Sequence, residues 1–371
     1  MKARAYVEVN LGAIRANLKR IADGTDADIL AVVKADAYGH GLIPVARTAL
    51  EAGASWLGVA LLEEALQLRT AGITAPLIAW LTPPGDDFEA AIDNNIDLSI
   101  SSLQLLREVH DAGLALGKKP RVHIEVDTGM RRGGFLAEWS EFLQELEFVK
   151  ADLEIIGLWS HFARADEPDS DFSEVQIRQF QAREAELEEL GITPSITHLS
   201  NSAAALRIAG AHRSLVRVGI AMYGLSPDVE FMGSSQQLGL QPAMSIYAKL
   251  VNVKFAEKGS AVGYGGTAVL TDDTHLGIVA MGYSDGLPRR ASSDAGATIN
   301  GVRAPLVGRV SMDQCIIDCG ESPSCVGGDY VQIFGATESG YTADDWAKAS
   351  GTINYEIVTR IAARLPRIYI D

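Results

Sequence analysis

The sequence contains little cysteine. Its 371 residues include three, Cys315, Cys319 and Cys325. An odd number of cysteines in so long a chain does not form a disulfide framework, and this set lacks the fourth ligand of a structural zinc site. We therefore expect small, buried or half-buried thiols in a reducing compartment.

Positive charge is also scarce. Lysine and arginine total 32 against 48 aspartate and glutamate residues, which gives a formal net charge of −16 at pH 7. A nucleic-acid-binding protein needs a basic surface to displace the counterions of the phosphates. The sequence therefore predicts no nucleic-acid partner.

Long apolar segments are absent as well. No run reaches about 18 consecutive apolar residues, the length that a membrane-spanning helix requires. The first residues, MKARAYVEVNLGAI, contain no apolar core of signal-peptide length. We expect a soluble, cytoplasmic protein without a membrane partner.

The first two-thirds of the chain does have a regular alternation of short apolar runs and longer amphipathic segments. The runs are ILAVVK (29–34), WLGVAL (56–61), PLIAWL (76–81), IDLSIS (96–101), RVHIEV (121–126), EIIGLWSH (154–161), SITHLS (195–200) and SLVRVGI (214–220). Near-continuous apolar strands that alternate with helices indicate parallel strands buried on both faces. Eight such units predict a (β/α)8 TIM-type barrel over residues 9–232, and no G-x-G-x-x-G fingerprint supports a dinucleotide fold.

The pattern changes near residue 232. The segment MGSSQQLGLQPA (232–243) is polar, and the runs beyond it alternate with period 2 between glycine-rich turns. Residues 233–371 therefore predict a mainly antiparallel β-domain, to which we assign the opening strand 1–8 because the barrel already has eight strands. Two helices close the chain, and we expect Thr342 to cap the first and Asn354 to cap the second, over 355–364.

In a barrel of this kind, side chains at the carboxyl ends of the strands line the active site. Lys34 closes the first strand, where low-dielectric surroundings would depress the pKa of its amine and make it nucleophilic. On position alone, a solvated lysine is the commoner case. The other polar or small residues at strand ends are Glu125, Asp127, Arg132, His161, His198, Asn201, Ser202, Arg217 and Gly219.

The loops after strands 7 and 8 of such barrels often bind phosphate. Asn201–Ser202 and Gly219–Ile220 supply a hydroxyl, small side chains and accessible backbone N–H groups there. A lysine facing such a site suits a phosphorylated aldehyde held as a Schiff base, for which pyridoxal phosphate is the obvious candidate. His161 and His198 could instead be core histidines, and His198 has no assigned role. No group has the spacing of metal ligands, so no metal site is predicted.

Several motifs together resemble those of a known family. AVVKADAYGHG (31–41) looks like the cofactor-lysine motif of the alanine racemases. The similarity continues in order through DTGMRRGG (127–134), WSHFARADE (159–167), HLSNSAAAL (198–206), VRVGIAMYG (216–224), VGYGGT (262–267), GYSDGLPRR (282–290) and VGRVSMDQ (307–314). The resemblance implies an enzyme that interconverts L- and D-alanine with pyridoxal 5'-phosphate and supplies D-alanine for peptidoglycan synthesis. It also implies a homodimer with shared active sites.

The resemblance implies two opposed acid–base groups, Lys34 and Tyr264, one on each face of the substrate Cα. Lys34 would also hold the cofactor, and Tyr264 would come from the partner subunit, projected outward by the glycines of GYGG. Arg217 would face the pyridine nitrogen. Because a guanidinium stays charged, it would keep that nitrogen unprotonated, which weakens the cofactor as an electron sink and favours racemisation over transamination.

The remaining site residues follow from the same resemblance. His161 would brace Arg217, and Arg132 would contact the phenolic oxygen of the cofactor and help to bind the substrate carboxylate. The backbone N–H of Met312 would also hold that carboxylate, and Tyr283 would narrow the entrance from the partner's side. The phosphate would be held by Tyr38, Ser202, Gly219, Ile220 and Tyr355, with Asn201 nearby.

One position departs from the family pattern. Many members have a lysine two residues before the DTG, carbamylated so that it carries a negative charge and orients the neighbouring arginine. Here that residue is Glu125. We hypothesise that its carboxylate supplies the anion for Arg132 directly, with a bridging water where the shorter side chain does not reach.

Other interpretations remain open at this point. A decarboxylase of the same two-domain class, or a racemase of broader amino-acid range, would share these features. A single-barrel protein that binds the cofactor without turnover would end near the barrel. This chain continues into a domain that carries Tyr264 and Met312, and that extension favours catalysis.

Overall fold

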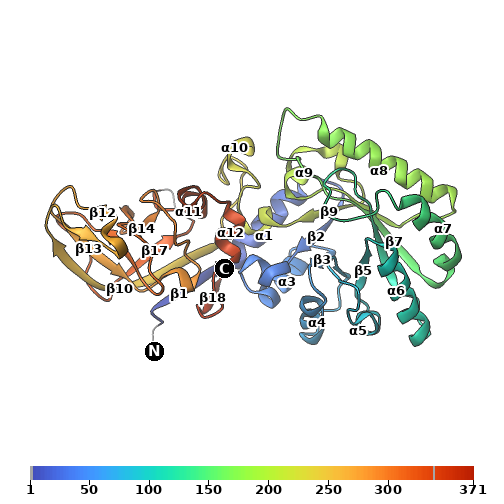
Figure 1. Ribbon diagram of the computed structural model, residues 1–371, viewed down its shortest axis with the longest axis horizontal. Coiled ribbons are helices and arrows are strands. Elements are labelled where there is room, and N and C mark those ends of the chain that lie inside the picture. Colours follow the sequence, from blue (N-terminus) through green and yellow to red (C-terminus); the bar gives the residue numbers. More distant parts are fainter. Residues whose placement is uncertain (1–2, 337–338) are drawn as a thin grey trace.

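The computed structural model describes residues 3–336 and 339–371. Figure 1 shows a barrel with its helices on the outside and an elongated β-domain beside it, with helix α12 (Asn354–Thr359) between them. The predicted architecture, a parallel barrel followed by a mainly antiparallel β-domain, is confirmed.

The barrel consists of eight parallel strands, and each of the eight apolar runs of the sequence contains one of them. They are β2 (Asp28–Val32, which begins one residue before its run), β3 (Trp56–Val59), β4 (Leu77–Ala79), β5 (Asp97–Ile100), β6 (Arg121–Glu125), β7 (Glu154–Trp159), β8 (Ile196–His198) and β9 (Leu215–Val218). Strand β2 pairs with both β3 and β9. Between β8 and β9, the N–H of Arg217 donates to the carbonyl of Ser200 at 3.0 Å, which closes the ring.

Most of the barrel helices lie between these strands in the sequence, while α1 precedes β2 and α10 follows β9. They are α1 (Leu11–Ala22), α2 (Lys34–Tyr38), α3 (Leu42–Glu51), α4 (Leu62–Thr70), α5 (Phe88–Asp93), α6 (Leu103–Leu116), α7 (Trp139–Val149), α8 (Phe172–Glu189), α9 (Ser202–Arg207) and α10 (Val229–Met232). Capping side chains start several of them: Asn10 accepts from the N–H of Ala13 at 2.7 Å at the start of α1. Apolar strands and apolar helix faces form one continuous core.

The β-domain is organised along one long strand, β10 (Met244–Ala256). Its first half pairs with β1 (Ala5–Asn10) and β17 (Tyr330–Phe334), and its second half pairs with β13 (Thr274–Val279). The remaining strands are β11 (Ala261–Val262), β12 (Ala268–Val269), β14 (Gly296–Ile299), β15 (Val302–Pro305), β16 (Cys315–Asp318) and β18 (Arg367–Ile370). Of the opening segment 1–8, residues 1–2 lie outside the described residues.

The two closing helices differ in how well the sequence predicted them. Thr342 caps α11 (Ala343–Ser350) as expected, with its hydroxyl accepting from the N–H of Asp345 at 3.1 Å. The prediction for the second helix was wrong, because α12 ends at Thr359 and its N-cap is Ile353. Asn354 instead donates through Nδ2 to the carbonyl of Ser226 at 2.9 Å, and so ties α12 to the end of the barrel.

All three cysteines are free, with Cys315 and Cys325 buried and Cys319 half-buried, as expected. Within the described residues, no helix has both the length and the apolar character needed to cross a membrane.

Candidate active site

Lys34 lies at the carboxyl end of β2, where the chain makes an unusual turn. The residues Ala35–Tyr38 all have φ between +52° and +54°, a left-handed conformation that costs roughly 1–2 kcal/mol for each L-residue. Two carboxylates compensate: Glu64 accepts from the N–H of Ala35 at 2.6 Å, and Asp36 accepts from the N–H of Leu42 at 2.8 Å. The fold therefore specifies the direction in which the chain leaves Lys34.

The surroundings of Lys34 favour its neutral amine. Burial lowers the pKa of Lys34, and the positive charges of Arg132 and Arg217 lower it further, while the carboxylate of Glu64 opposes them. The neutral amine is the nucleophilic form. The direction of this pKa shift agrees with the expectation from the sequence, and the role of Lys34 as a nucleophile stays a prediction.

A small cradle lies beside this turn, between the ends of β8 and β9. The hydroxyl of Ser202 accepts from the N–H of Gly219 at 2.9 Å. A Cβ added to Gly219 would lie 2.6 Å from the hydroxyl oxygen of Tyr38, so a larger residue there would require the Tyr38 side chain to move. The ring of Tyr38 lies 6.2 Å from that of Tyr355 between centroids, and Ile220 is buried at the base. These five predicted phosphate residues are therefore brought together.

Asn201 lies next to the cradle but has a local structural task. Its side chain caps α9 by accepting from the N–H of Ala204 at 3.0 Å. This capping makes Asn201 a residue that positions Ser202 at the first turn of the helix.

Arg217 is buried on β9, and both terminal nitrogens of its guanidinium donate to neighbouring groups. Nη2 donates to Nδ1 of His161 at 3.1 Å, and Nη1 donates to Nδ1 of His198 at 3.2 Å and to the carbonyl of His198 at 2.9 Å. Burial lowers the pKa of Arg217 to about 9, with the charge of Glu125 opposing, so the group stays charged at neutral pH. The predicted contact between His161 and Arg217 is present.

Both histidines are neutral. Burial, followed by the charge of Arg217, holds the pKa of His161 and of His198 well below the ordinary value. Since each Nδ1 accepts from Arg217, each ring carries its proton on Nε2.

The sequence analysis missed a buried chain of hydrogen bonds that continues from His198. Nε2 of His198 lies 3.0 Å from Nδ1 of His123, and Nε2 of His123 lies 3.1 Å from a carboxylate oxygen of Asp97. Asp97 in turn accepts from Nε of Arg121 at 2.7 Å. Each group in this chain donates to the next: Arg217 to His198, His198 to His123, and His123 to Asp97. The available signal was the alternation of β6, which places His123 on the same face as Glu125.

Glu125 and Arg132 line one pocket with His161 and Asp127. Within residues 3–336 and 339–371, no ion pair joins Glu125 directly to Arg132, whose side chain is exposed. Burial raises the pKa of Glu125 to about 7, while the charges of Arg132 and Arg217 oppose this rise. The charge of Arg132 acts on Glu125 across the pocket without direct contact, and the role of Glu125 as the anion for Arg132 stays a prediction.

Three predicted site residues lie elsewhere, in the β-domain. Tyr264 is 69% exposed, Met312 55% and Tyr283 36%. Gly263 and Gly265, which flank Tyr264, have φ of +74° and +77°, as expected of a turn that projects the ring outward. Strand β12, which follows Tyr264, lies at the end of the β-domain away from the barrel (Figure 1).

Comparison with known proteins points to one family. The model of the alanine racemase N-terminal domain matches residues 9–227, and that of the C-terminal domain matches residues 243–369. The alanine racemase of Salinispora tropica is 43% identical over 371 residues, which are 99% of this chain and 98% of that protein.

Solved structures agree with this result. The alanine racemase of a D-cycloserine-producing Streptomyces lavendulae is 42% identical with a TM-score of 0.97, over 100% of this chain and 98% of that one. The Bacillus anthracis alanine racemase, solved with bound L-Ala-P, is 39% identical with a TM-score of 0.91, over 100% and 96% of the two chains. The chain belongs to the alanine racemase family, the pyridoxal-phosphate-dependent isomerases that interconvert the two enantiomers of alanine.

Proposed function

We propose that the protein racemises alanine with two opposed acid–base groups, Lys34 of one subunit and Tyr264 of the other, and so supplies D-alanine for peptidoglycan synthesis in the cytoplasm. The observation that carries this proposal is the contrast between the two groups. Lys34 is largely buried beside Arg217, whereas Tyr264 is 69% exposed on the other domain. Two groups so placed reach one substrate when a second copy of the chain supplies Tyr264.

The residues around Lys34 fit pyridoxal phosphate. The Gly219 cradle, with the hydroxyls of Ser202 and Tyr38, offers donors and the space that a Cβ would fill, which suits a phosphate. The amine of Lys34 can hold the aldehyde, and Arg217 can donate to the pyridine nitrogen. The bound cofactor supplies the electron withdrawal that makes the Cα–H bond of alanine acidic.

Lys34 and Tyr264 then divide the proton transfer. A single base returns a proton to the face from which it came, whereas racemisation needs a donor on the opposite face. With its lowered pKa, the amine of Lys34 accepts or donates a proton at Cα on one face. The phenol of Tyr264 does the same on the other face.

Arg217 limits how far negative charge moves away from Cα. Its guanidinium stays charged and only donates, so it would leave the pyridine nitrogen of a bound cofactor unprotonated. His161 and His198 accept from the guanidinium and hold it in place. Charge retained at Cα favours return of the proton there, which favours racemisation over transamination.

The substrate carboxylate is held by Arg132 and by the backbone N–H of Met312 from the partner subunit. Bound L-Ala-P in the Bacillus anthracis relative supports a site for an alanine-like ligand. Glu125 supplies the anion that orients Arg132, and a water bridges the two because no direct ion pair joins them in the described part of the chain. Glu125→Gln should therefore raise the KM for alanine; unchanged turnover and affinity would exclude this role.

The two domains have different roles in this proposal. The barrel, residues 9–232, holds the cofactor and Lys34. The β-domain, residues 233–371 with the strand 1–8, lends Tyr264, Met312 and Tyr283 to the active site of the partner, with Tyr283 at its entrance. Their exposure in the single chain supports this homodimer.

The test uses purified protein loaded with pyridoxal phosphate. We expect a visible absorption band and loss of optical rotation from L-alanine, and weaker activity across a panel of other L-amino acids. Release of carbon dioxide would instead support a decarboxylase, and a band without racemisation of any amino acid would support cofactor binding alone.

A further inference from the structure

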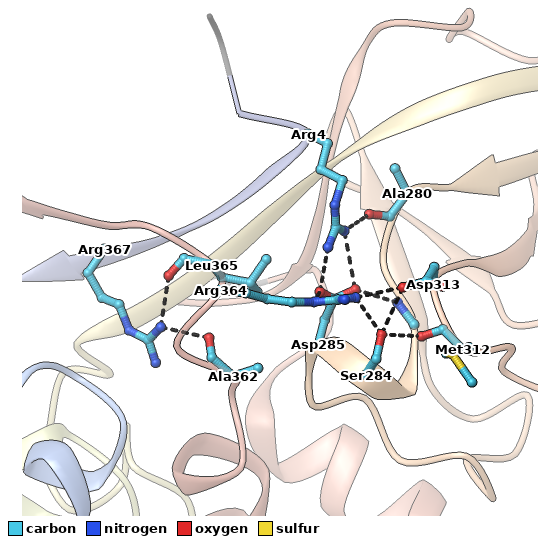
Figure 2. A network of polar contacts seen from close by, with 11 residues as sticks. Arg4, Ala280, Ser284, Asp285, Met312, Asp313, Ala362, Arg364, Leu365 and Arg367 are labelled. Carbon is cyan, nitrogen blue, oxygen red and sulfur yellow. Dashed lines mark hydrogen bonds and ion pairs between the residues drawn. The ribbon is translucent and has the colours of Figure 1, made fainter.

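A cluster of four charged side chains and one serine in the β-domain takes no part in the site as described. It consists of Arg4, Ser284, Asp285, Asp313 and Arg364, which Figure 2 shows converging from both ends of the chain and from two loops. The carboxylate of Asp285 lies at the centre, fully buried. We call this group the Asp285 cluster.

Asp285 is surrounded by donors. Nη2 of Arg4 and Nε of Arg364 donate to its Oδ1 at 2.6 and 2.5 Å, and the N–H of Gly282 donates to its Oδ2 at 3.0 Å. Burial alone would raise the pKa of Asp285, but these hydrogen bonds outweigh burial and hold it below the ordinary value. The carboxylate is therefore ionised, and it stabilises the turn 282–285 by accepting from the N–H of Gly282.

This turn is bonded directly to the neighbouring loop 311–314. The N–H of Tyr283 donates to the carbonyl of Ser311 at 3.0 Å, and the N–H of Ser284 donates to the carbonyl of Met312 at 2.9 Å. Arg364 strengthens the junction, because its Nη2 donates to the hydroxyl of Ser284 and, at 2.8 Å, to Asp313. The two loops form one unit (Figure 2).

The bond between Tyr283 and Ser311 determines where the N–H of Met312 points. The carbonyl of Ser311 and the N–H of Met312 belong to the same trans peptide and point in opposite directions. With its carbonyl end fixed by Tyr283, this peptide directs its N–H away from the turn. Among the described residues, that N–H has no acceptor. It remains available to an anion from outside the chain.

We infer that Asp285 and Arg364 are positioning residues, which hold Tyr283 and the N–H of Met312 in register for the active site of a second copy of this chain. The inference rests on the proposed function, in which the partner's site receives these two groups. The cluster itself touches neither substrate nor cofactor. Its effect reaches them through the turn 282–285 and the peptide that joins Ser311 to Met312.

A loosened loop should weaken carboxylate binding more than it slows the proton transfers. We expect Arg364→Ala to raise the KM for alanine by about tenfold, the size of a hydrogen bond to a charged group, with a much smaller change in kcat. Arg364 is half-exposed, so the variant should fold; Asp285→Asn provides a second variant with the same expected split. Arg360→Ala is the matched control, because it removes an arginine of the same segment whose ion pair, among residues 3–336 and 339–371, is with Glu356.

The decisive experiment is complementation between subunits. Arg364→Ala and Lys34→Ala chains, carrying different tags, are co-expressed, and the cofactor-loaded heterodimer is purified. Its one working site combines Lys34 of the first chain with the intact loops of the second. We expect a wild-type KM and about half of the wild-type kcat per dimer. A Tyr264→Phe and Lys34→Ala heterodimer is tested in parallel.

The outcomes separate the inference from the proposed function. If the Tyr264→Phe heterodimer recovers activity but the Arg364→Ala heterodimer keeps the raised KM, the cluster does not act on the partner's site and the inference is overturned. A wild-type KM in both the Arg364→Ala and Asp285→Asn homodimers overturns it as well. If neither heterodimer recovers, the shared active site of the proposed function fails, and the inference fails with it.

Discussion

Nη2 of Arg217 lies 3.1 Å from Nδ1 of His161, and the histidine accepts this hydrogen bond. Since the same guanidinium also donates to Nδ1 of His198 at 3.2 Å, it is held from two sides by neutral rings. A group held in this way keeps its charge and its direction while a substrate exchanges. This rigidity underlies the role that we propose for Arg217 toward the cofactor.

Loss of Lys34 should remove both cofactor attachment and catalysis. We expect Lys34→Ala to lose the visible absorption band and all detectable racemisation, because Lys34 supplies the amine that would hold the cofactor's aldehyde. Absorption spectra and polarimetry measure the two effects. Lys19→Ala, on the exposed face of α1, is the control and should behave as wild type. Retained racemisation in Lys34→Ala would exclude its assigned role.

The space at Gly219 can be tested separately from the chemistry. Gly219→Ala places a Cβ 2.6 Å from the hydroxyl of Tyr38 and should weaken the binding of pyridoxal phosphate at least tenfold. Fluorescence titration of the cofactor-free protein measures this affinity. Gly210→Ala adds a Cβ with nothing within 4 Å and should leave the affinity unchanged. Equal affinities in the two variants would exclude the cradle as the phosphate site.

The raised pKa of Glu125, about 7, predicts a pH-dependent stability. The folded, cofactor-free chain binds the proton of Glu125 more tightly than the unfolded chain does. The contribution of Glu125 is therefore complete below its ordinary pKa and declines as pH rises through about 7.

Between pH 5 and 8 this decline amounts to up to about 3 kcal/mol in the free energy of unfolding of the wild type. Glu125→Gln should remove it. Denaturation by urea across that range measures the difference. Parallel pH curves for the wild type and the variant would show that Glu125 does not titrate there.

The buried chain from Arg217 to Asp97 should contribute to stability. His198→Leu leaves Arg217 and His123 each without one partner and should lower the free energy of unfolding by about 2–4 kcal/mol. His110→Leu, which loses a partly exposed contact with Asp152, should cost less than about 1 kcal/mol. Chemical denaturation of both variants tests the contrast; equal losses would contradict it.

The barrel could be predicted because each of its strands is marked by a short apolar run in the sequence. Each apolar run is short, continuous and followed by a helix, so burial on both faces could be inferred without knowledge of distant partners. The positions at strand ends then indicated Lys34, His161 and Arg217. Their roles, in contrast, came from the resemblance to a family.

What the sequence did not reveal depends on residues that are far apart in the chain. Arg4, Asp285 and Arg364 meet only because β1 pairs with both β10 and β18. His198 and His123 lie on different strands, and no local period links them. Asn354 was mistaken for a cap because its side chain is used as a donor, through Nδ2 to the carbonyl of Ser226 more than 100 residues away and to Asp344.

The central claim is that Lys34 and Tyr264 act on opposite faces of the same Cα. Cofactor-loaded Tyr264→Phe, followed in D₂O by NMR from each pure enantiomer of alanine, tests it most directly. Our account predicts a retained absorption band, continued exchange of the Cα hydrogen from one enantiomer, and racemisation reduced at least 100-fold, on the scale of general acid–base catalysis. Undiminished racemisation from both enantiomers would contradict the account.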